Sequence, residues 1–67
     1  MNKYVAWKLN EKGIQIGKDR IFNADSIKNV FSVLAVEENV KYKNERVLLR
    51  LPNNCTWHVK ILHINKI

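Results

Sequence analysis

The clearest periodic pattern in the chain is IKNVFSVL, residues 27–34. Its apolar side chains are spaced i, i+3, i+4 and i+7, which places them along one side of an α-helix. They are Ile27, Val30, Phe31 and Leu34. Because Ile, Val, Phe, Asn and Ser all have low helix propensity, such a helix must be stabilised by packing against a sheet. The segment therefore predicts one amphipathic helix of about three turns.

Two residues compete to cap the start of this helix. Asn23 and Asp25 both carry side-chain oxygens that can accept from free backbone N–H groups, and Asp25 also suits the positive end of the helix dipole. Phe22 is placed to pack onto Ile27 as a hydrophobic staple. The sequence predicts a helix start within residues 23–27.

Upstream of the helix, the sequence predicts a β-hairpin. Residues 3–9 alternate as a half-buried strand does, with Val5, Trp7 and Leu9 expected to face the core and Tyr4, Ala6 and Lys8 to face away. Residues 10–13 form a turn that ends in a glycine, and residues 14–16 resume the alternation. A second turn-like cluster follows at residues 17–20. Two alternatives remain for Ile21 and Phe22, which either extend the second strand or lead into the helix.

Downstream of the helix, the alternation of apolar residues predicts three more strands. The first covers residues 36–43, the second residues 46–51, and the last runs through residues 57–61. Residues 52–54 (Pro-Asn-Asn) give the best turn signal in the chain. We expect an α+β fold for residues 1–67, one small basic domain. Its antiparallel sheet has the order ββαβββ, with the helix on one face or with the sheet partly curled into a barrel.

Charge and cysteine content indicate the class of partner and the cellular location. Twelve Lys and Arg against six Asp and Glu give a net charge of +6, which favours polyanionic partners. Cys55 is the only cysteine, so no internal disulfide can form, and we expect a reducing, cytoplasmic location. We expect neither a signal peptide nor a membrane span. The abundance of Asn, Lys and Ile suggests an AT-rich coding sequence such as that of a phage or mobile element.

The outward positions of the last strands predict a basic sheet surface. Its residues are Lys8, Lys41, Lys43, Arg46, Arg50, His58 and Lys60, with Tyr4 beside them. Phosphates bind to cations spread over such a platform, and an aromatic ring can stack on a base. A solvated, non-functional face is the alternative for these cations. Leu48 and Leu62 are expected on the same surface, where they would suit a protein partner.

Metal binding and catalysis find weaker support. Cys55, His58 and His63 are potential zinc ligands, but an extended strand places residue 58 on the opposite face from the other two. A small ribonuclease would use His58 or His63 as general acid or base and Arg46 or Arg50 to stabilise the transition state. No Gly-rich phosphate loop occurs. We expect no enzymatic activity, no metal and no cofactor.

The two tryptophans and the two adjacent glutamates are predicted to have structural rather than functional roles. Trp7 and Trp57 occupy positions expected to face inward, so both are predicted to belong to the core, with exposed binding anchors as the alternative. Glu37 and Glu38 are predicted to be solvated residues at the start of the third strand.

Three functions follow from this interpretation. The first is a non-enzymatic module that binds nucleic acid through its sheet. The second, nearly as well supported, is an inhibitor or regulator of the kind phages and mobile elements encode, which covers an acidic surface of a host or defence complex. The third is the ribonuclease. A homodimer formed through an edge strand, such as residues 63–67, remains open.

Overall fold

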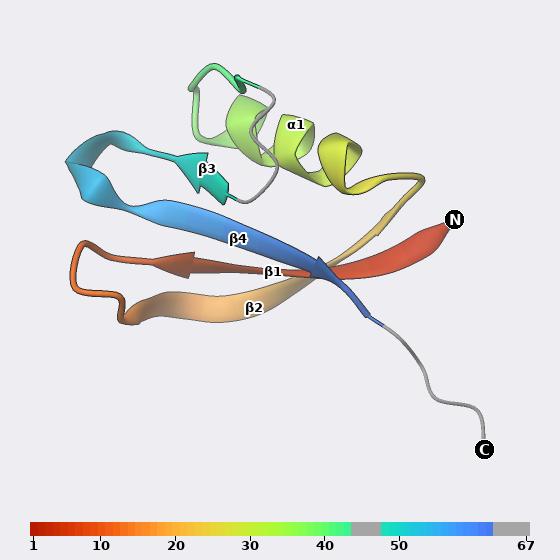
Figure 1. Cartoon of the computed structure of the whole chain (residues 1–67), viewed down its shortest axis with the longest axis horizontal. Helices are drawn as coiled ribbons and strands as arrows, with labels where there is room; N and C mark the ends of the chain where they lie inside the picture. Colours follow the sequence, from red (N-terminus) through yellow and green to blue (C-terminus); the bar gives the residue numbers. More distant parts are fainter. Residues whose placement is uncertain (44–47, 63–67) are drawn as a thin grey trace.

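The computed structural model describes residues 1–43 and 48–62 and has an α+β fold (Figure 1). In chain order its elements are β1 (Asn2–Leu9), β2 (Gln15–Ala24), α1 (Ile27–Glu37), β3 (Leu48–Arg50), a 3₁₀ turn (Pro52–Asn54) and β4 (Thr56–Ile61). The predicted class, a small antiparallel sheet with one helix packed on it, is confirmed. In the described residues, no helix is both long and apolar enough to cross a membrane.

The sheet has the strand order β2-β1-β4-β3, and each neighbouring pair is antiparallel. The first and last strands therefore lie side by side at its centre, while α1 connects the two edge strands. Because β2 and β3 occupy opposite edges and are not paired, the sheet is open rather than curled into a barrel. Figure 1 shows α1 on one side of this sheet.

The helix begins and ends at polar residues that satisfy its free backbone groups. Ser26, rather than Asn23 or Asp25, is the N-cap, and its hydroxyl accepts from the N–H of Asn29 at 3.3 Å. At the other end Asn39 takes a left-handed conformation (φ 58°), which asparagine tolerates better than most residues. The predicted apolar stripe is confirmed, because its last three residues are at most 1% exposed. The predicted length is also confirmed, at 11 residues.

The strand predicted over residues 36–43 is wrong. Its first two residues complete α1, and residues 38–43 contain no strand. Val40 and Tyr42 nevertheless pack against the core, and the Tyr42 ring stacks on Phe31 with 5.6 Å between ring centroids. The alternation of apolar residues therefore reflects an extended segment that covers the edge of the core without joining the sheet.

The predicted faces of the first strand are inverted. Tyr4 (5% exposed) and Ala6 (0%) lie in the core, whereas Val5, Trp7 and Leu9 are half-buried on the other side of the sheet. Register explains the assignment, because Ala6 lies directly opposite Val59 and side chains of directly opposed residues point the same way. A small side chain at the centre of the sheet also allows a helix to pack closely.

The second strand differs from its prediction in one respect. Residues 17–20 do not form a turn, because β2 runs without interruption from Gln15 to Ala24. Instead the strand bulges: only Trp7 lies between Ala6 and Lys8 in β1, whereas residues 17–19 lie between their partners in β2. Gly17 has φ 76°, a conformation that glycine adopts without steric cost.

The turns predicted at residues 10–13 and 52–54 are confirmed. In the β1–β2 turn, Gly13 has φ 80° and the Asn10 side chain accepts from the N–H groups of Lys12 and Ile14 at 2.8 and 3.0 Å. In the β3–β4 turn, Asn53 and Asn54 have φ 65° and 61°. Glycine in the first turn and asparagine in the second, both tolerant of left-handed geometry, therefore set the two connections.

Candidate functional site

The sheet has one face covered by α1 and one face on which no described segment packs. We call the second face the open face. Its side chains, assigned by strand register, come from all four strands: Gln15, Ile21 and Asn23 of β2, Lys3, Val5, Trp7 and Leu9 of β1, Thr56, His58 and Lys60 of β4, and Leu48 and Arg50 of β3. None of these residues is buried. The open face is therefore a solvent-accessible surface to which every strand of the sheet contributes side chains.

A stacked aromatic pair occupies the centre of the open face. Trp7 and His58 lie directly opposite each other in β1 and β4, and their rings stack with centroids 5.5 Å apart and planes 16° from parallel. The Thr56 hydroxyl hydrogen-bonds the Nε2 atom of His58 at 3.0 Å, which holds the imidazole in this orientation. Leu48 continues the row across β3.

This arrangement corrects the prediction that both tryptophans belong to the core. Trp57 does, with 7% of its surface exposed, and its Nε1–H donates to Glu38 at 2.8 Å. Trp7 instead lies on the open face, because the faces of β1 are inverted relative to the prediction. The sequence allowed either face of β1 to be buried, since residues 4–9 carry apolar side chains at both odd and even positions.

Cations surround the aromatic pair. Lys60 lies opposite Val5 at one end of the face, beside Lys3, and Arg50 lies opposite Thr56 at the other end. All three are exposed. The side chains that strand register assigns to this face include no carboxylate. Asp19 lies at its rim, in the bulge of β2, where it accepts from the Gln15 amide at 2.6 Å.

Lys8, predicted to belong to the basic surface, lies on the opposite side of the sheet. Its ammonium is 3.0 Å from a carboxylate oxygen of Glu38 and 5.9 Å from the centroid of the Trp57 ring. The reason is again the inverted register of β1, which points even-numbered residues toward α1. The structure therefore separates Lys8 from His58 and Lys60.

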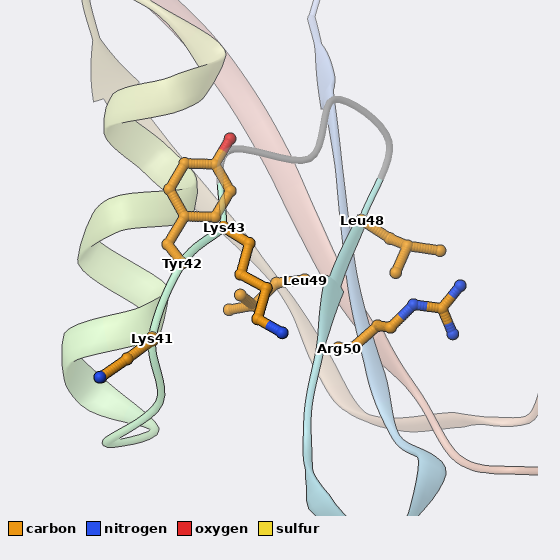
Figure 2. A pocket seen from close by; sticks show the side chains of 6 residues that line it. All are labelled: Lys41, Tyr42, Lys43, Leu48, Leu49 and Arg50. Atoms are coloured by element: carbon orange, nitrogen blue, oxygen red, sulfur yellow. The ribbon is translucent and has the colours of Figure 1, made fainter.

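Two other predicted cations, Lys41 and Lys43, lie beside the sheet rather than on it. They belong to the segment after α1 and line a pocket of about 150 Å³ together with Tyr42, Leu48, Leu49 and Arg50. Figure 2 shows Leu48 and Arg50 on one side of β3 and Leu49 on the other, toward Tyr42, while Lys41 points away from β3. Arg50 thus connects this pocket to the open face. Arg46 lies outside the described residues.

Sequence reasoning missed the role of the two adjacent glutamates at the end of α1. Glu37 forms a bidentate ion pair with Arg20 of β2, whose guanidinium also lies 4.7 Å from the centroid of the Phe22 ring. Glu38, the C-cap, accepts from both Trp57 and Lys8. We call these contacts the glutamate clamp. Glu37 is exposed, as predicted, but it ends α1 instead of beginning a strand, and Glu38 is half-buried, which corrects its prediction as a solvated residue. The sequence signal for these contacts is the pair of acidic residues at the end of an apolar helix.

The glutamate clamp also shifts the ionisation of its members. The hydrogen bond from Trp57, aided by Lys8, lowers the pKa of Glu38 below its usual value of 4.5. The hydrogen bond from Arg20 lowers the pKa of Glu37, and the same bond raises the pKa of Arg20. Two cations of this basic chain are therefore neutralised on the face that α1 covers.

The residues weighed for metal binding and catalysis are only partly described. Cys55 is a half-buried thiol just before β4, and His58 contacts Trp7 and Thr56. His63 lies outside the described residues. Within residues 1–43 and 48–62, no group of three His, Cys, Asp or Glu side chains is placed to hold a metal ion.

Comparisons with models of protein families, with curated proteins and with solved structures find no match to this chain. A functional assignment therefore depends on the chemistry of the open face. That face combines a stacked aromatic pair, flanking cations and apolar side chains, a combination suited to non-covalent binding.

Proposed function

We propose that this chain is a non-enzymatic module that binds nucleic acid through the open face of its sheet. The observation that carries the proposal is the stacked Trp7–His58 pair with Lys3, Arg50 and Lys60 around it. Phosphates supply the negative charge that these cations attract, and bases supply flat rings for the aromatic pair. Its single cysteine is consistent with action in the cytoplasm.

The distribution of ion pairs supports this choice of face. The chain carries a net charge of +6, and the ion pairs of Lys8 and Arg20 both lie on the helix-covered face. Lys3 and Lys60 form no ion pair within the described part of the chain. Their charge therefore remains available to a ligand approaching the open face, where it adds affinity and speeds association.

A salt series tests the proposal most directly. Affinity for unrelated DNA and RNA sequences is measured between low and physiological salt. Three phosphate contacts predict a slope of log K against log salt of about −2 to −3, with similar affinity for every sequence. An absence of measurable binding to any nucleic acid at low salt would contradict the proposal.

One observation favours a second candidate, a protein-binding inhibitor or regulator of the kind phages and mobile elements encode. The open face includes several apolar side chains, and Ile21 among them is 58% exposed. Apolar patches rimmed by polar residues are typical of protein interfaces, and the cations would then meet an acidic partner surface. A stoichiometric protein recovered from the native host, lost on Ile21→Glu, would favour this candidate when nucleic-acid binding is absent.

A further inference from the structure

We infer that the ligand of the open face is single-stranded nucleic acid, whose unpaired bases stack on Trp7, rather than a duplex. The inference rests on the proposed function and specifies its ligand class. Three features of the open face carry it: the orientation of the aromatic pair, the small number and spacing of the cations, and the apolar side chains between them.

The aromatic pair is arranged to receive a base. Trp7 is only half-buried, and its ring is held near-parallel to that of His58, which is itself fixed by Thr56. Stacking on this pair therefore orders few additional side-chain torsions. Bases within a duplex are already stacked on each other and present only their edges in the grooves, so an unpaired base alone can use this pair.

The cations are few and lie within a short span of the open face. Arg50 lies opposite Thr56, and Thr56 is four residues from Lys60 along β4. The strand positions of Arg50 and Lys60 are therefore separated by roughly 13 Å. Cations thus flank the aromatic pair at both ends, a spacing that suits a few nucleotides of one strand. Duplex-binding proteins commonly insert a helix or ribbon into a groove, and α1 lies on the other side of the sheet (Figure 1).

The surface between the cations is apolar. Val5 and Leu9 flank Trp7 along β1, and Leu48 continues the row beyond His58. Side chains of this kind gain from contact with the flat, weakly hydrated faces of bases, whereas the phosphate backbones that coat a duplex must stay hydrated or ion-paired. The open face therefore matches a splayed single strand with bases inward and phosphates at the cations.

The experiment compares a fluorescently labelled oligo-dT of about 12 nucleotides, a matched oligo-U, and a duplex of the same length, each titrated with the full chain at one low salt concentration. Two variants divide the aromatic contribution from the apolar one. Trp7→Leu keeps an apolar side chain but removes the ring, and Trp7→Phe restores a smaller ring. Circular dichroism checks that both variants fold.

We expect both single strands to bind more tightly than the duplex. Trp7→Leu should weaken single-strand binding by roughly 5- to 150-fold, Trp7→Phe should recover most of that loss, and duplex affinity should be unchanged in both. Duplex binding equal to or tighter than single-strand binding, or a Trp7→Leu variant with unchanged single-strand affinity, would overturn this inference and leave the proposed function standing. No binding to any of the three probes would overturn both.

Discussion

The two faces of the sheet use the same residue type in opposite ways. On the covered face, Trp57 is buried beneath α1 and its indole N–H is bonded to Glu38. On the open face, Trp7 lies one strand away, half-buried, with its ring stacked on an imidazole. Carboxylates neutralise two cations on the first face, whereas Asp19, at the rim of the second, accepts from the Gln15 amide and forms no ion pair within the described residues. The comparison indicates that one face maintains the fold while the other stays accessible to solvent.

The largest expected effect separates the two tryptophans by stability. Trp57→Ala should cost about 3–5 kcal/mol of unfolding free energy, because it leaves a cavity beneath the helix and removes a donor to Glu38. For a domain this small, that loss would remove much of the stability of the folded state. Trp7→Ala should cost only about 1 kcal/mol, because Trp7 is half-buried outside the helix-covered core and its removal leaves no cavity beneath α1.

Urea unfolding followed by circular dichroism measures both variants. Equal losses of stability for Trp7→Ala and Trp57→Ala would contradict the assignment of the two residues to different faces.

A smaller effect concerns the glutamate clamp. The folded state lowers the pKa of Glu38, so the clamp stabilises the fold above the usual value of 4.5 and this contribution is lost as pH falls below that value. Glu38→Gln should therefore cost about 1 kcal/mol near neutral pH and less at pH 3. Urea unfolding at both pH values tests this difference. An equal cost at both would show that charge plays no part in the clamp.

The smallest effect compares one lysine from each face. Lys60→Ala should reduce the slope of log K against log salt for single-stranded ligand by about 0.7, because one phosphate contact is lost. Lys8→Ala removes the same charge from the covered face and should leave that slope unchanged, at a stability cost of at most about 1 kcal/mol. A salt-dependent anisotropy titration measures both. Equal changes in slope would mean that ligand binding follows net charge rather than the open face.

Much of the fold could be predicted because several local signals are unambiguous. The apolar stripe of α1, the glycine and asparagine turns, and the inward positions of Trp57 and Val59 each have one physical interpretation. The first strand does not: Tyr4 and Ala6 compete with Val5 and Trp7 for the core. A shift of one residue exchanges the faces of a strand, so only its pairing with β4 resolves the choice.

The candidate site was harder to predict because it depends on that choice. Arg50, His58 and Lys60 lie on one face, as predicted, because β4 alternates cleanly and β3 pairs with it in register. The prediction for Lys8 was wrong, because the faces of β1 are inverted. The predictions for Lys41 and Lys43 were wrong because both lie in a segment that does not join the sheet. Trp7, the residue central to the proposal, was predicted to lie in the core. Only the structure shows that it lies on the open face beside His58.

One spectrum tests whether the open face is where nucleic acid binds. The two tryptophan indole N–H groups give separate signals in a proton–nitrogen correlation spectrum, assigned with a Trp7→Phe variant, and single-stranded oligonucleotide is added stepwise. We predict that the Trp7 signal moves steadily to saturation, while the Trp57 signal, bonded to Glu38 beneath the helix, stays in place. A shift confined to Trp57, or neither signal moving while the oligonucleotide binds, would contradict the account.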